Sequence, residues 1–123
     1  MRCRFLCVLP LFPLLFPGSL FALSITWTGT NGSTWDNNTT INWNNAGTPE
    51  KFVTLDDVIF DDTSANGTVN LSGSLQPGSV TVNNGSTAYT FGGSGQFGGS
   101  TSLLKSGTGT LTISTRTASR AAP

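Results

Sequence analysis

Apolar residues recur every 22 residues through the middle of this chain. Such a fixed period is typical of a coil of strands in which every turn climbs one strand spacing and equivalent side chains stack in files. The three apolar columns that share the spacing are Phe60, Val82 and Leu104; Val69, Phe91 and Ile113; and Val53, Leu75 and Phe97. Thr68, Thr90 and Thr112 form a polar column with the same spacing. The recurrence predicts a parallel β-solenoid of about three rungs over residues 53–114.

Short alternating runs within each repeat indicate which side chains point inward. The expected inward residues are Val58, Phe60, Val80, Val82 and Leu104 in one set, and Val69, Leu71, Tyr89, Phe91, Leu111 and Ile113 in the other. Turn residues separate these runs, among them Asn83-Asn84-Gly85 and Lys105-Ser106-Gly107. The alternative fold is an antiparallel sandwich with strands every 8–12 residues. The solenoid is favoured because one spacing holds over three columns.

Residues 25–52 break this spacing and carry Trp27, Trp35 and Trp43 at equal intervals. The terminal repeat of a solenoid is often atypical because it must cover the open end of the stack. The segment is therefore predicted to be an N-terminal cap whose tryptophans cover the first rung. If the tryptophans were exposed on one face instead, they would suggest a carbohydrate-binding module.

Residues 1–24 have the pattern of a secretory signal peptide: Arg2 and Arg4 precede an apolar stretch from Phe5 to Ala22. Small residues at Ala22 and Ser24 predict cleavage before Ile25. A membrane anchor is the alternative, but prolines at 10, 13 and 17 would interrupt a spanning helix. Both cysteines of the chain lie in this segment, so no disulfide is expected in the exported part.

Composition argues against several chemistries. The chain has no histidine and, beyond the leader, no cysteine, which excludes catalytic triads and histidine- or cysteine-ligated zinc sites. No basic stripe is available for nucleic acid. Few basic residues follow the leader, so a polysaccharide lyase site is not expected either; they are Lys51, Lys105, Arg116 and Arg120. No catalytic, cofactor or metal residue is predicted, and the chain is not expected to be an enzyme.

An acidic group is the one candidate site: Asp56, Asp57, Asp61 and Asp62. Carboxylates grouped in this way could bind calcium or act as a pair in glycoside cleavage. The spacing does not match an EF-hand loop. The favoured interpretation is that these residues form two solvated turns on either side of a buried Val-Ile-Phe strand.

The stretch from Thr101 to Ser114 resembles the autotransporter-associated β-strand repeat. The matching residues are Leu104, Lys105, Gly107, Gly109, Thr110, Leu111 and Thr112. The segment upstream is similar, more loosely, to the start of large surface proteins that carry such repeats; it contributes Trp27, Gly29, Trp35, Asn42-Trp43, Phe60-Asp61-Asp62 and Val80-Thr81-Val82-Asn83. The chain departs from the family after Ile113, where Ser-Thr-Arg replaces the usual Asn-Tyr-Thr-Gly run, and only one clear repeat is present.

The resemblance implies a right-handed parallel β-helix of the pertactin type and a non-catalytic, often adhesive, structural role at the cell surface or outer membrane. Its partner would be a surface glycan or a host or matrix protein, with membrane contact only through the leader or a C-terminal barrel. The expected organisation is a signal peptide over 1–24, a cap over 25–52, solenoid repeats over 53–114 and an irregular tail over 115–123. A secreted carbohydrate-binding β-sandwich module is the alternative.

Overall fold

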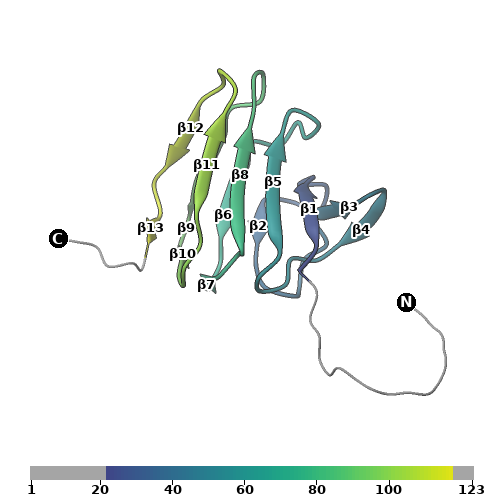
Figure 1. The fold of residues 1–123 in the computed structure, drawn as a ribbon, viewed down its shortest axis with the longest axis vertical. Helices are drawn as coiled ribbons and strands as arrows, with labels where there is room; N and C mark the ends of the chain where they lie inside the picture. The colour runs from purple at the N-terminus through teal and green to yellow at the C-terminus, as the bar shows by residue number, and fades with distance from the viewer. Residues whose placement is uncertain (1–21, 118–123) are drawn as a thin grey trace, which may run out of the picture.

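The computed structural model describes residues 22–117, and this part of the chain is all-β, without a helix (Figure 1). Its strands are β1 (Ser24–Trp27), β2 (Thr34–Trp35), β3 (Trp43–Asn45), β4 (Thr48–Glu50), β5 (Asp57–Asp61), β6 (Thr68–Leu71), β7 (Ser74–Leu75), β8 (Ser79–Asn83), β9 (Tyr89–Gly93), β10 (Gln96–Phe97), β11 (Leu103–Ser106), β12 (Leu111–Ile113) and β13 (Arg116–Thr117). The predicted all-β class is confirmed.

The strands form three sheets, and each repeat contributes one strand to each sheet. The orders are β11-β8-β5-β1-β3-β4, β12-β9-β6-β2 and β13-β10-β7. Strands from successive repeats pair in parallel, and β5, β8 and β11 lie side by side in Figure 1. Within residues 22–117, only the β1-β3 and β3-β4 pairs are antiparallel. Because the repeats pair in parallel, the arrangement contradicts the alternative of an antiparallel sandwich.

The second apolar column is confirmed by the strand register. Val69 pairs with Phe91, and Phe91 pairs with Ile113. The polar column behaves in the same way, since Thr90 lies between Thr68 and Thr112. Neighbouring residues in a parallel register point to the same face of the sheet. The apolar file therefore faces inward while the threonine file is exposed to solvent.

The first column holds from Phe60 to Val82 but not to Leu104, where the prediction was wrong. Lys105 pairs with Val82, and Leu104 pairs with Thr81 on the outward face. A slip of one residue moves a side chain to the opposite face of a strand. Leu104 is accordingly 62% exposed instead of buried.

The slip has its origin in the lengths of two corners. Leu75 pairs with Phe97, and Val80 pairs with Leu103, so the chain from Phe97 to Leu103 is one residue longer than its equivalent in the preceding repeat. The next corner compensates, because the chain from Lys105 to Leu111 is one residue shorter than its equivalent between Val82 and Tyr89. One extra residue is thus inserted before β11 and removed after it. The original spacing therefore returns in β12.

The third column is confirmed only for Leu75 and Phe97, which pair between β7 and β10. Val53 lies outside any strand and is 40% exposed, so its predicted place in the column was wrong. The turn that contains Val53 is held by a side chain instead, because its backbone N–H donates to the Asp56 carboxylate at 2.9 Å. A local turn bond of this kind competes with strand formation.

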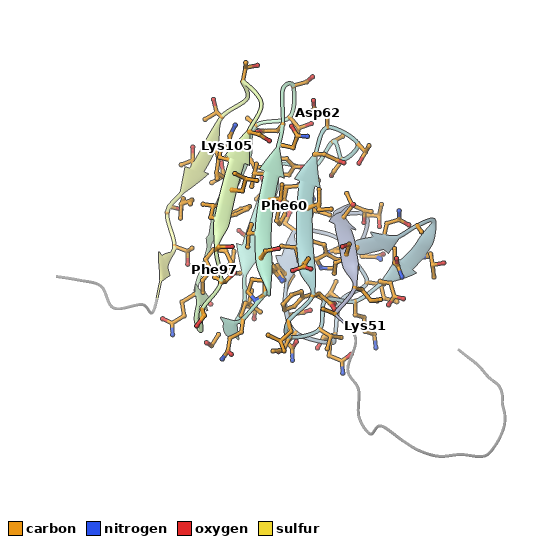
Figure 2. All side chains as sticks on the ribbon, viewed as in Figure 1. Lys51, Phe60, Asp62, Phe97 and Lys105 are labelled. Carbon is orange, nitrogen blue, oxygen red and sulfur yellow. The ribbon has the colours of Figure 1, made fainter. Side chains whose placement is uncertain are left out.

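The core is aromatic and includes Phe60 of β5, which Figure 2 labels. Trp27, Trp35 and Trp43 are all buried, at 0%, 0% and 1% exposure. Edge-to-face packing joins the rings, with centroids 5.1 Å apart for Trp27 and Trp43 and 5.2 Å apart for Trp35 and Trp43. The prediction that these residues cover the first repeat is confirmed.

The N-terminal segment does more than cover the stack. Strands β1 and β2 pair in parallel with β5 and β6, so they extend two of the sheets. The β3-β4 hairpin then extends the largest sheet beyond β1, and β4 is its edge strand (Figure 1). At the other end, Arg116 and Thr117 form strand β13 where an irregular tail was expected. Most of the predicted leader lies outside the described residues, but Ser24 begins strand β1.

Candidate functional site

The acidic group does not converge on one point. Strand β5 alternates in burial, and its ends carry Asp57 and Asp61, while Asp56 precedes it and Asp62 follows it. The carboxylates at the first end bond to different partners: Asp56 accepts from the backbone N–H groups of Leu23 and Val53 at 3.0 and 2.9 Å, and Asp57 accepts from the Ser79 hydroxyl at 2.9 Å. Residues 22–117 contain no group of three or more acidic, histidine or cysteine side chains placed to hold a metal ion.

At the second end of β5, Asp61 stabilises its own turn and Asp62 bonds to the next repeat. The Asp61 carboxylate accepts the Thr63 N–H at 3.0 Å, and the backbone carbonyl of Asp61 accepts the Tyr89 hydroxyl at 2.5 Å. Burial raises the pKa of that tyrosine hydroxyl to about 12, so it remains a donor at physiological pH. The residues at this end therefore connect neighbouring repeats.

Asp62 receives three backbone hydrogen bonds, each of 3.0 Å, from Gly85, Ser86 and Thr87. These donors lie in the corner that follows β8, one repeat further along the chain. The bonds from Thr87, Gly85 and Ser86 lower the pKa of the Asp62 carboxyl, because they favour its charged form. The role that this geometry supports is the alignment of two adjacent corners.

Asp62 predicts a specific dependence of stability on pH. Because its pKa is lower in the folded state, Asp62 stabilises the fold at pH values above its ordinary value of 3.8. That stabilisation is lost as the pH falls from 3.8 through the lower folded-state value. Thermal unfolding followed from pH 7 to pH 2 should therefore show a wild-type advantage over Asp62→Asn at neutral pH that disappears in acid. Two curves that stay parallel over the whole range would contradict this assignment.

The tryptophans offer no binding platform. A sugar-binding face requires aromatic rings exposed on one surface, whereas all three indoles lie inside the core. Trp27 donates its Nε1–H to the Asn66 carbonyl at 2.9 Å, a bond that fixes the ring within the fold. The carbohydrate-binding alternative therefore loses the feature on which it rested.

The C-terminal ends of the three sheets are open in the part of the chain that the structure describes. Strands β11, β12 and β13 are each the last strand of their sheet, so each has one unpaired edge. Beside β11 and β12 lies a hollow of about 190 Å³ whose lining includes the apolar residues Val80, Phe97, Leu103 and Ile113. Leu103 and Ile113 are 48% and 42% exposed although both occupy inward positions. An end of this kind can accept another strand or rung.

Lys105 places a charged side chain on β11 at this open end. It occupies the inward file begun by Phe60 and Val82. Its Nζ donates to the backbone carbonyls of Ser106 and Gly107 at 3.0 and 3.1 Å, which turns the charge toward the corner after β11. Figure 2 shows Lys105 near the same end of the strands as Asp62. A charge beside an open edge is one way in which proteins restrain unwanted strand pairing.

Two fully buried asparagines were not predicted from the sequence. Asn84 is fully buried, and its side-chain amide donates to the carbonyls of Thr87 and Thr110 at 2.7 and 3.0 Å. Asn42 is also fully buried; it donates to Thr34 and accepts from the backbone N–H of Asn31. In a chain so rich in asparagine, composition gives no signal that separates these two from the exposed ones. Both satisfy backbone groups at corners.

No family model, curated protein or solved structure matches this chain. The described residues include no helix long and apolar enough to span a membrane. The functional interpretation consequently depends on the geometry and on the sequence patterns.

Proposed function

We propose that this chain is an exported, non-catalytic structural module of the autotransporter type, built as a right-handed parallel β-helix and displayed at the cell surface. The observation that carries the proposal is the parallel stacking of three strands per repeat, with two complete files in register. Such a stack presents an elongated scaffold with no need for a catalytic pocket. The leader-like residues at the N-terminus supply the export signal.

The surface of the module suits an extracellular scaffold. Its polar files consist of short uncharged side chains, such as the solvent-exposed Thr68, Thr90 and Thr112. The four aspartates near β5 accept hydrogen bonds from turns and from the next repeat, and so stabilise the fold. The partner implied for such a module is a surface glycan or a host or matrix protein, which would contact the outer faces of the sheets.

Export can be tested with the full chain expressed in a Gram-negative bacterium with a C-terminal epitope. We expect the epitope in the periplasm, on the surface or in the medium. Leu14→Arg combined with Leu15→Arg should retain it in the cytoplasm, because two charges in the apolar stretch block recognition as a leader. The matched control, Leu103→Arg combined with Leu104→Arg, adds the same charges outside the leader and should still be exported. Wild-type protein confined to the cytoplasm would contradict the proposal.

A further inference from the structure

The residues at the start of β1 are integrated into the fold. The backbone N–H of Leu23 donates to Oδ1 of Asp56 at 3.0 Å, and the Leu23 carbonyl accepts the N–H of Asp57 at 2.8 Å. Ser24 pairs with Asp57 in the parallel register of β1 and β5. The Leu23 side chain is half-buried against the aromatic core. Cleavage before Ile25, as the small residues predict, would remove all of these contacts.

Asp56 is a buried carboxylate whose donors in the described residues are uncharged. It is 3% exposed and accepts one backbone N–H on each oxygen, from Leu23 and from Val53. A carboxylate withdrawn from water is costly unless a positive charge or several donors compensate it. The Leu23 nitrogen is the donor to Oδ1 in this arrangement. That nitrogen would carry a positive charge if Leu23 were the first residue of the chain.

The surroundings of the Leu23 nitrogen leave space for a chain terminus. Ala22 is exposed and lies outside any strand. A hollow of about 180 Å³ opens here, lined by Ala22, Leu23, Asp56 and neighbouring residues that include Glu50 and Lys51. An ammonium at Leu23 could therefore bond to Asp56 with one hydrogen while water in the hollow solvates the others. Ala22 also supplies a small residue immediately before the scissile bond, as leader peptidases require.

We propose that a leader peptidase hydrolyses the bond between Ala22 and Leu23, and that the new α-ammonium of Leu23 forms a buried ion pair with Asp56. Water adds across the C–N bond, leaving a carboxylate on Ala22 and an amine on Leu23 that takes up a proton. The inference rests on the proposed export. It shifts the processing site upstream of the position that the sequence pattern favours, and it keeps every contact of Leu23 and Ser24.

The first test is the N-terminal sequence and intact mass of wild-type protein recovered outside the cytoplasm. Leu23 is expected as the first residue. A first residue of Ile25, or any other residue, overturns the inference while leaving export intact. Unprocessed chain confined to the cytoplasm instead overturns the proposed function, so the two failures are distinguishable.

The second test measures the charge of the terminus in the exported protein. The α-amine is labelled with an amine-reactive ester, and the N-terminal peptide is quantified by mass spectrometry so that Lys51 and Lys105 do not contribute. A paired ammonium loses its proton less readily, so labelling at neutral pH should be about tenfold slower in the wild type than in Asp56→Asn. Asp57→Asn, which removes the neighbouring carboxylate, should label at the wild-type rate. Equal rates for the wild type and Asp56→Asn would overturn the ion pair.

A measurement on the wild type alone covers the case in which Asp56→Asn fails to fold. The labelling rate is followed against pH for the native protein and for the same protein in urea. The midpoint in urea should lie near the ordinary value of about 7.7–8.0 for an α-amine. The native midpoint should lie higher, because the Asp56 carboxylate favours the ammonium. A native midpoint at or below the value in urea would also overturn the proposal.

Discussion

Replacement of Trp35 with alanine is expected to remove a large part of the stability of the folded state. Trp35 is fully buried and lies at the centre of the aromatic cluster, with ring centroids 5.2 to 6.2 Å from those of its partners Trp43, Phe52, Phe60, Phe91 and Phe97. Removing a buried Trp side chain costs about 3–5 kcal/mol. A small domain has a marginal stability of only about 5–15 kcal/mol at best. Far-UV circular dichroism with increasing urea should show a greatly lowered midpoint or no transition.

Ile41→Ala is the matched control for this loss. Ile41 is also an apolar residue of the N-terminal segment, but it is 41% exposed and lies outside the core cluster. Surface substitutions of this kind usually change stability by less than about 0.5 kcal/mol. If Trp35→Ala and Ile41→Ala shifted the urea midpoint equally, the aromatic cluster would not be the main source of stability in this fold.

Regular spacing was sufficient to predict part of the fold. A constant interval places equivalent residues in register only where each corner keeps its length, as for the file of Val69, Phe91 and Ile113. The file from Phe60 failed at Leu104 because the corner before β11 is one residue longer than its equivalent before β8. The constant interval in the sequence predicted that Leu104 would lie next to Val82. The stacking of backbone strands, however, places Lys105 next to Val82.

The roles of the acidic residues were predictable only in outline. Turn composition placed these residues in turns at both ends of β5, but the expectation that both turns are solvated was wrong for Asp56, which is 3% exposed. Asp61 bonds within its own turn, but several partners of the other carboxylates were not predictable, because they lie far away in the chain. Asp56 bonds to Leu23, 33 residues earlier, and Asp62 bonds to Gly85, 23 residues later. Such contacts follow from the stacking of repeats and carry no local sequence signal.

Corners in a stack bring backbone segments of adjacent repeats into direct contact, and Gly67 shows the consequence. It lies just before β6, and its carbonyl accepts the N–H of Thr90 from the next repeat at 2.8 Å. A Cβ atom at Gly67 would lie 1.9 Å from the Ala88 carbonyl oxygen. Nothing flexible is available to move, since the obstructing atom belongs to the backbone that precedes β9. The requirement for glycine at this position is therefore steric.

Gly67→Ala should consequently destabilise the protein by about 3 kcal/mol, at the upper end of the costs of overpacking. Gly73→Ala separates this effect from backbone strain, because Gly73 has φ of 81° but no atom within 4 Å of an added Cβ. Left-handed backbone alone costs an L-residue about 1 kcal/mol. Urea unfolding of both variants should thus give a clearly larger loss for Gly67→Ala. A larger loss of stability for Gly73→Ala than for Gly67→Ala would contradict this prediction. It would mean that the close contact between Gly67 and the Ala88 carbonyl does not exclude a side chain at this position.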